Sequence, residues 1–337
     1  MPFFTSGSAR RSYTARAKGS GGSNPSTASE VTGRTWERWD AKEVHYRAIN
    51  DDKGRMMVMI CHNTDNGDGW EREGENEYYF REFSEKACPG EVTGPLTGSL
   101  VAGGKSNLTY IVGDGRKEWV VRRPPLGHVL ATAHDMTREY RVMTALRDTD
   151  VPVPRTYALC EDEAVVGAQF YVMERVHGTP YRTAKELEAL GRERTEAISR
   201  RSVETLATLH SVDPAAVGLQ DFGRPEGFLE RQVRRWKKQL DASHSRDLQG
   251  ADELHRLLER NLPVEQAPAI VHGDYRLDNL MFHAGQPRII AVLDWELSTL
   301  GHPLADFSYH CMAWHMPGGE GSRGLLGLDL AALGIPS

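Results

Sequence analysis

The stretches VHGDYRLDNLMFH (residues 271–283) and IIAVLDWE (residues 289–296) decide how this 337-residue sequence is interpreted. Both combine acidic or amide side chains with runs of Val, Ile and Leu. Such apolar runs are typical of buried strands, so the polar groups between them are held by a core instead of lying on a solvated face. The polar residues concerned are Asp274, Asp278, Asn279, Asp294 and Glu296.

The composition is that of a globular protein, with 39% hydrophobic and 26% charged residues. A net charge of -6 and the lack of a long basic stripe argue against a nucleic-acid binder. No apolar run approaches the roughly 18–20 residues of a membrane span. The four cysteines show no C-x-x-C spacing, which favours reduced thiols and a cytoplasmic location.

Changes in composition and in the pattern of apolar residues divide the chain into four parts. Residues 1–33, rich in Ser and Gly, are expected to form a disordered tail. Residues 34–93 form a small extra segment of unknown role. In it, VHYRAI and RMMVMICH predict a β-hairpin, and NEYYFREFSEKA predicts a helix. Residues 94–178 are expected to form a sheet-rich lobe, and residues 179–337 a helical lobe.

The sheet-rich lobe begins with two predicted strands, at 108–112 and 118–122, joined by the turn GDG. An amphipathic helix follows, which VPVP ends because proline cannot continue a helix. Its apolar residues are Met136, Tyr140, Met143 and Leu146. The stretches YALCED and AQFYVMERVHG predict further strands, the second ending at Gly178.

The helical lobe shows three further runs of apolar residues at helical spacing. These are Ile198, Val203, Leu206 and Leu209; then Leu229, Val233, Trp236 and Leu240; then Leu254, Leu257 and Leu258. The short strands that carry the opening motif come last. A sheet-rich lobe followed by a helical lobe that bears the acids predicts an α+β fold of the bilobal protein-kinase type.

Asp274, Asn279 and Asp294 supply the oxygen ligands that Mg²⁺ prefers. Phosphoryl transfer from ATP needs this ion against the phosphates, a carboxylate near the acceptor hydroxyl, and cations on the donor phosphates. The His-Gly pair before Asp274 suits a tight loop. Asn279 follows five residues later, so the loop can turn back, and Asp294 ends an apolar strand whose backbone can fix its position.

HGDYRLDN followed by LDWE resembles the catalytic and metal-binding loops of the aminoglycoside phosphotransferase / choline kinase-like superfamily, and GHPLADFSYH extends the likeness. SNLTY, VVRRPP, REYRVMTAL, VPVPRTYALCED and FYVMERVHG are similar to the phosphotransferase domains associated with acyl-CoA dehydrogenases. The resemblance covers residues 95–337. Family members usually continue with further helices, so the helical lobe is expected to be incomplete, in a truncated or fused chain.

The resemblance implies specific roles in the second lobe. Asp274 would be the catalytic base or the carboxylate that orients the hydroxyl, and Asn279 and Asp294 would bind Mg²⁺. His272 is expected to support the loop backbone. Asp306 is expected to hold the catalytic loop through hydrogen bonds.

Expected roles can also be given for two further acids and for one segment. Glu296 either joins the metal site or lies beside it, and Asp278 is expected to be an exposed loop acid. Backbone groups from Glu174 to Val176 are expected to contact adenine.

In the sheet-rich lobe the resemblance departs from the usual kinase pattern, in which a Lys pairs with a Glu of the following helix. Here the position falls on Arg122, with Glu139 as the expected partner and Arg123 as the alternative. Arg can neutralise phosphate and pair with carboxylate through its planar fork. Ser106 and Asn107 are expected to contact the nucleotide phosphates.

Other functions stay open at this point. GSLVAGGKS approaches a P-loop, but a P-loop needs a following helix, and SNLTYIV predicts a strand. A kinase-like protein that binds nucleotide without turnover is the second alternative. The acceptor is expected to be a small molecule with a hydroxyl group. The resemblance suggests a hydroxyacyl-CoA, while aminoglycosides, choline-like alcohols and sugars remain open.

Overall fold

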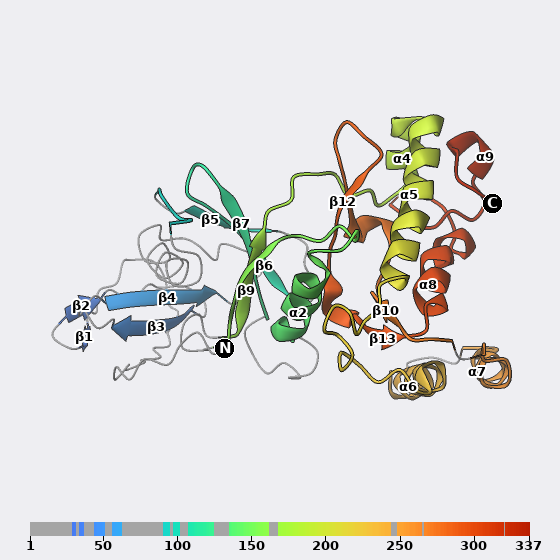
Figure 1. Cartoon of the computed structure of the whole chain (residues 1–337), viewed down its shortest axis with the longest axis horizontal. Coiled ribbons are helices and arrows are strands. Elements are labelled where there is room, and N and C mark those ends of the chain that lie inside the picture. Colours follow the sequence, from blue (N-terminus) through green and yellow to red (C-terminus); the bar gives the residue numbers. More distant parts are fainter. Residues whose placement is uncertain are drawn as a thin grey trace. The chain divides into compact units, whose positions relative to one another are not determined.

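The computed structural model describes twelve stretches of the chain, which form two compact units (Figure 1). Unit 1 comprises Met1–Tyr140 and Arg155–Arg175, and unit 2 comprises Arg141–Pro154 and Val176–Ser337. The described residues are 29–31, 34–36, 44–50, 56–62, 90–94, 97–101, 107–124, 135–161, 168–243, 248–264, 266–319 and 321–337.

Four strands, in two antiparallel pairs, precede the main sheet in the sequence. The antiparallel pairing predicted from VHYRAI and RMMVMICH is confirmed by β3 (Val44–Asn50) and β4 (Met56–His62). A second antiparallel pair consists of β1 (Ser29–Val31) and β2 (Arg34–Trp36). The helix predicted at residues 76–87 lies outside the described residues.

Unit 1 is built on a five-stranded antiparallel sheet with the order β5–β6–β7–β9–β8. Trp119 and Tyr171 of this sheet are buried, as expected for strands rich in aromatic and β-branched residues. The last strand predicted from the sequence ends at Glu174, opposite Trp119, and not at Gly178. The strands are β5 (Thr97–Leu100), β6 (Leu108–Gly113), β7 (Glu118–Arg123), β8 (Thr156–Cys160) and β9 (Phe170–Glu174).

Helix α2 (Met136–Leu146) confirms the amphipathic pattern of the sequence. Met136, Met143 and Leu146 are buried, so the predicted apolar side faces the core. The helix starts after Asp135, whose carboxylate accepts a hydrogen bond from a backbone N–H of the first turn. It ends before VPVP, as the sequence predicts.

The second stretch of unit 2 begins with two helices, α4 (Ala184–Leu190) and α5 (Arg192–His210), and the first predicted run of apolar residues lies on α5. Gly191 separates them with a φ of 82°, a conformation that side chains other than glycine rarely adopt. The predicted apolar side of α5 is buried at Ile198 and Leu206. Val203 was assigned to the same side but is 43% exposed, because it points away from the packed side of the helix.

Helices α6 (Phe228–Ala242) and α7 (Ala251–Arg260) are confirmed as helices and contact each other (Figure 1). On α6, Trp236 is 65% exposed while Leu229, Val233 and Leu240 are half-buried. On α7, Leu254 is 58% exposed, and Leu257 and Leu258 are exposed as well. The predicted helical spacing is therefore correct, but the described part of the chain covers the apolar side of α6 only in part and leaves that of α7 exposed.

The opening motif lies on two short antiparallel strand pairs of unit 2. They are β10 (Ala269–Val271) with β13 (Thr299–Gly301), and β11 (Leu280–Phe282) with β12 (Ile289–Val292). Helix α5 packs against β10 and β12. The remaining helices are the 3-10 turns η1 (Leu277–Asn279) and η2 (Trp295–Leu297), then α8 (Leu304–His315) and α9 (Leu330–Leu333).

None of the helices described is both long enough and apolar enough to cross a membrane.

Candidate active site

The segment after β10 forms a tight loop around Gly273. Gly273 has a φ of 83°, and a Cβ atom there would lie 2.7 Å from the carbonyl oxygen of Leu297. Only glycine fits this close approach without strain. The loop therefore folds sharply against η2 and presents Asp274, which is half-buried with a side chain 15% exposed.

Asp306, on the first turn of α8, holds the backbone of this loop. Its Oδ2 accepts a hydrogen bond from the N–H of His272 (2.7 Å), and its Oδ1 accepts one from the N–H of Gly273 (2.8 Å). The Nε2 of His210 lies 3.0 Å from Oδ2. Because Asp306 is only 1% exposed, these hydrogen bonds replace those with water that its carboxylate would otherwise make.

His272 links the loop to the end of β12. Its Nε2 lies 2.9 Å from the carbonyl oxygen of Leu293, and its Nδ1 lies 3.2 Å from the N–H of Asp274. This arrangement fits a neutral ring that donates from Nε2 and accepts at Nδ1. Burial lowers the pKa of His272, although nearby carboxylates, Asp306 first, act in the opposite direction. The geometry favours a structural role for this ring.

Asn279 ends η1 and faces Asp274. Its Nδ2 donates to the carboxylate Oδ2 of Asp274 (2.9 Å) and to the backbone carbonyl oxygen of the same residue (2.9 Å). The N–H of Asn279 donates to the carbonyl oxygen of Arg276 (2.9 Å), which closes the turn. The loop thus turns back as expected from the five-residue spacing, and it brings the two polar side chains into contact.

Asp294 lies immediately beyond the β11–β12 pair. The N–H of Leu293 donates to the carbonyl oxygen of Asn279 (2.8 Å), so the residue before Asp294 is bonded to the end of η1. Asp294 is the only non-glycine residue with a positive φ (66°) among those described. Such a conformation is strained and persists where the surroundings hold it. Glu296 follows in η2 and is half-buried.

The side chains of Asn279 and Asp294 fit Mg²⁺ by their chemistry. A carboxylate and an amide oxygen are hard ligands, and Mg²⁺ usually takes one or two carboxylates besides phosphate oxygens and water. No group of three or more His, Cys, Asp or Glu within the described stretches is arranged to hold a metal ion by itself.

Unit 1 contains a second polar cluster, centred on Glu139 of α2. Its Oε2 lies 2.9 Å from Nη1 of Arg122 on β7 and accepts a hydrogen bond from the hydroxyl of Tyr171 on β9 (2.8 Å). Its Oε1 accepts a hydrogen bond from Nδ2 of Asn107 (3.1 Å). The cluster is buried, with Glu139 only 1% exposed. The Nε of Arg123 donates instead to the carbonyl oxygen of Pro124 (3.2 Å).

The other nucleotide-binding candidates are Ser106 and the backbone from Glu174 to Val176. The N–H of Glu174 donates to the carbonyl oxygen of Arg155 (2.7 Å), so it is not available as a donor to adenine. Val176 is half-buried at the start of the second stretch of unit 2. Ser106 lies outside the described residues.

Comparison with known proteins identifies the family. A model of the phosphotransferase enzyme family matches residues 97–330. The chain belongs to this family. Among curated relatives of this phosphotransferase, acyl-CoA dehydrogenase family member 10 of Mus musculus is 40% identical over 246 residues, which are 73% of this chain and 23% of that protein. Family member 11 of Gallus gallus is 41% identical over 230 residues, which are 68% of this chain and 29% of that protein.

The phosphotransferase thus spans about a quarter of the length of these curated relatives. A crystal structure from Ralstonia eutropha, provisionally described as an aminoglycoside phosphotransferase, is 44% identical, with a TM-score of 0.69. The match covers 77% of this chain and 76% of that one. The structure of the streptomycin-ATP-APH(2")-IIa ternary complex is 17% identical in sequence, with a TM-score of 0.51. This match covers 72% of this chain and 76% of the chain in that complex, and it shows that the two share a fold.

These comparisons confirm the resemblance and the kinase-like α+β fold expected from the sequence. They identify a phosphotransferase of small-molecule type. The P-loop alternative fails, because Asn107 is followed directly by strand β6 and not by the helix that a P-loop requires.

The structure corrects the sequence analysis of Asp278. This residue was expected to be an exposed loop acid, but its side chain is 9% exposed and lies 2.9 Å from Nη2 of Arg323 and 3.5 Å from Nε of Arg276. Arg276 also lies 2.9 Å from Oδ1 of Asp274. Neither arginine was singled out from the sequence. The pairing with Arg323 joins positions 45 apart, which spacing cannot reveal.

Tyr309 was also missed. Burial raises the pKa of the Tyr309 hydroxyl, as does its hydrogen bond to Asp274. Tyr309 lies three residues after Asp306 on α8, and side chains at this spacing share one side of a helix. The helical position of Asp306 was therefore a usable signal for Tyr309.

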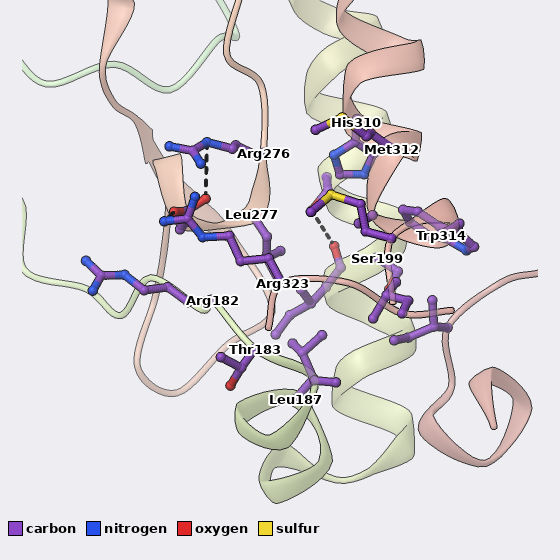
Figure 2. A pocket seen from close by; sticks show the side chains of 18 of the residues that line it. Arg182, Thr183, Leu187, Ser199, Arg276, Leu277, His310, Met312, Trp314 and Arg323 are labelled. Atoms are coloured by element: carbon purple, nitrogen blue, oxygen red, sulfur yellow. Dashed lines mark hydrogen bonds and ion pairs between the residues drawn. The ribbon is translucent and has the colours of Figure 1, made fainter. Parts of the chain in front are cut away.

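A pocket of ≈ 160 Å³ adjoins the loop that follows Asp274 within unit 2 (Figure 2). Arg182, Arg276 and Arg323 lie on one side of it, and Met312 and Trp314 of α8 lie on the other. The interior is apolar. Its further lining includes Leu187, Ile198, Ala313, Leu325 and Ile335.

Proposed function

We propose that this protein transfers the γ-phosphoryl group of ATP to a hydroxyl group of a small molecule. The contact between Asp274 and Asn279, on a loop whose backbone Asp306 holds, is the observation that carries the proposal. It places a carboxylate and an amide ligand side by side on a rigid support. Phosphoryl transfer depends mainly on such positioning and on charge neutralisation.

In this proposal Asp274 accepts the proton of the acceptor hydroxyl and orients its oxygen toward the phosphorus. Asn279 and Asp294 would hold Mg²⁺, with Glu296 beside them. The ion, when bound, would neutralise charge on the phosphates. His272 and Asp306 support the loop and do not touch the reacting atoms.

Arg122 would neutralise donor phosphate, with Glu139 orienting its guanidinium group. An arginine suits this task because it stays charged and can bond an oxyanion through two N–H groups. Asn107 and Tyr171 fix the carboxylate of Glu139, so the side chain of Arg122 is held in one orientation. Ser106 and the backbone from Glu174 to Val176 complete the proposed nucleotide contacts, with the N–H of Glu174 excepted.

The pocket beside the loop favours an acceptor with an apolar chain and an anionic group. Its lining holds three arginines and one acid, Asp278, so the remaining positive charge would disfavour a polycationic aminoglycoside or a cationic choline-like alcohol. Its apolar interior suits hydrocarbon better than a sugar. A hydroxyacyl thioester of CoA meets both requirements, and two curated relatives are named as acyl-CoA dehydrogenase family members. We place the reaction in the cytoplasm.

A panel assay tests the reaction. The protein is incubated with Mg²⁺ and radiolabelled ATP, together with hydroxyacyl-CoA thioesters, free hydroxy acids, aminoglycosides, choline or sugars. We expect phosphorylation of the thioesters. Asp274→Ala should reduce turnover by orders of magnitude while nucleotide binding persists, and Asp294→Ala should weaken Mg²⁺-ATP binding in calorimetry. Binding of ATP without turnover across the whole panel would favour the non-catalytic alternative.

A second variant tests the pocket. Ala313→Trp would fill the pocket and should raise the KM of the acceptor while the KM of ATP stays unchanged. Ala242→Trp, at the exposed end of α6, is the matched control and should change neither constant. An unchanged acceptor KM in the Ala313 variant would show that the acceptor binds elsewhere.

A further inference from the structure

The loop between Asp274 and Asn279 contains one acid, Asp278, that has no role in the proposed reaction. Asp278 is nearly buried between two arginines, with Nη2 of Arg323 at 2.9 Å from Oδ2 and Nε of Arg276 at 3.5 Å from Oδ1. Burying an ionised carboxylate to this degree destabilises the folded state unless groups of opposite charge compensate it. The two arginines supply that compensation, so Asp278 has a defined place in the structure.

Arg276 connects this pair to Asp274. Its Nε lies 2.9 Å from Oδ1 of Asp274, whereas the amide of Asn279 bonds Oδ2 (2.9 Å). The Nε of Arg276 is buried and has hydrogen-bond geometry to no partner, so its contacts with the two carboxylates are ionic. Oδ1 of Asp274 therefore faces Arg276 and Oδ2 faces Asn279, and the hydroxyl of Tyr309 also bonds this carboxylate.

Arg323 comes from the segment after α8 and is half exposed, with 49% of its side chain accessible. Figure 2 shows it beside Arg276 at the same wall of the pocket. Its ion-pair partner is Asp278, so its effect on Asp274 must pass through Asp278 and Arg276.

We propose that Arg276, supported by Asp278 and Arg323, is the positioning residue that sets the orientation of the Asp274 carboxylate. This inference rests on the proposed function, in which Asp274 accepts the proton of the acceptor hydroxyl. Arg276 attracts Oδ1 while Asn279 bonds Oδ2, which fixes the rotation of the carboxylate plane. Asp278 prevents Arg276 from turning toward solvent, and Arg323 in turn holds Asp278.

The kinetic constants of Arg276 variants test this role. Since small displacements of reacting groups cost up to about 100-fold in rate, Arg276→Gln should lower kcat by roughly 10- to 100-fold. The KM of Mg²⁺-ATP should stay within about twofold, because Arg276 touches the proposed base and not the nucleotide. Arg276→Lys keeps the charge without the planar fork and should recover part of the loss. Arg200→Gln, which removes an exposed ion pair with Glu196, is the matched control.

The supporting pair is tested by combination. Arg323→Gln and Asp278→Asn should each lower kcat less than Arg276→Gln does. The double variant should be no slower than Asp278→Asn alone, because Arg323 acts through Asp278. Additive losses would show that Arg323 acts on the acceptor directly and would overturn the supporting role.

Failure of the inference differs from failure of the proposed function. If the wild type is active and Arg276→Gln changes kcat by less than about twofold, the positioning role is wrong. If the wild type phosphorylates nothing in the panel, the proposed function is wrong. Crystal structures of wild type and Arg276→Gln then decide the inference separately: a rotated Asp274 carboxylate supports it, and an unchanged one overturns it.

Discussion

Asp306→Asn is the sharpest test of how the catalytic loop is held. The two oxygens of Asp306 accept from different N–H groups, Oδ1 from Gly273 (2.8 Å) and Oδ2 from His272 (2.7 Å). An amide has only one oxygen. Whichever way the asparagine side chain turns, its NH₂ group must therefore face one backbone N–H, and that donor is left unpaired.

The expected loss follows from these contacts. A hydrogen bond to a charged group contributes about 1.5–3 kcal/mol, and an unpaired buried donor costs a further ~1–3 kcal/mol. Because Asp306 is 1% exposed, water cannot compensate. Allowing for relaxation, Asp306→Asn should lower the free energy of unfolding by about 2–4 kcal/mol. Turnover should fall as well, because His272 and Gly273 immediately precede Asp274.

Urea unfolding and amide hydrogen exchange measure this effect. The urea midpoint should fall with an unchanged slope, and the amides of His272 and Gly273 should exchange faster. Asp252→Asn is the matched control, since Asp252 is 78% exposed and pairs with Lys237 at 3.2 Å. It should stay within about 0.5 kcal/mol of the wild type. If Asp306→Asn behaves like Asp252→Asn, the loop is held by something other than this carboxylate.

Four further substitutions, one of them a control, give distinct expectations. Trp295→Ala empties a fully buried site and should lower the free energy of unfolding by about 3–5 kcal/mol. Trp236→Ala, at 65% exposure, should change it by less than about 0.5 kcal/mol. Equal losses in denaturant titrations would contradict the burial pattern. Gly273→Ala should lower the free energy of unfolding by about 1–3 kcal/mol, because Gly273 has a φ of 83° and lies close to Leu297. A melting temperature equal to that of the wild type would refute this strain. Burial acts to raise the pKa of Asp114, but hydrogen bonds from backbone N–H groups outweigh it and hold this pKa below its usual value. The carboxylate therefore stabilises the fold above about pH 4, and this stabilisation is lost on acidification. Asp114→Asn should accordingly be less stable than wild type by about 1–3 kcal/mol at pH 7, with the difference narrowing below about pH 4 in thermal melts; a difference independent of pH would rule this out.

Local sequence patterns correctly predicted the elements whose conformation is determined by residues close to each other in the sequence. The strands on either side of the GDG turn and helix α2 agree with the alternation and helical spacing of their residues. The loop between Asp274 and Asn279 also follows from a short motif, because five residues and a glycine suffice to turn the chain back. In each case the interacting groups are close in sequence.

The remaining features depend on contacts between distant segments. A helical period shows that α6 has an apolar side, but not whether another segment covers it, and Trp236 is exposed. Asp278 lies in a polar loop, which predicts exposure, yet Arg323 reaches it from 45 positions away. The end of β9 at Glu174 likewise depends on where its partner strand β7 begins, at Glu118.

Besides its contacts with Arg276 and Tyr309, Asp274 has three further kinds of support inside unit 2. Asp306 bonds the loop backbone, the ring of His272 bonds both the N–H of Asp274 and the carbonyl of Leu293, and Asn279 bonds the carboxylate. The ring can perform both tasks only when neutral, and its burial favours that state. The carboxylate is therefore oriented before any ligand binds. Catalysis that depends on positioning gains most from such an arrangement, because no reorganisation is needed when the substrates arrive.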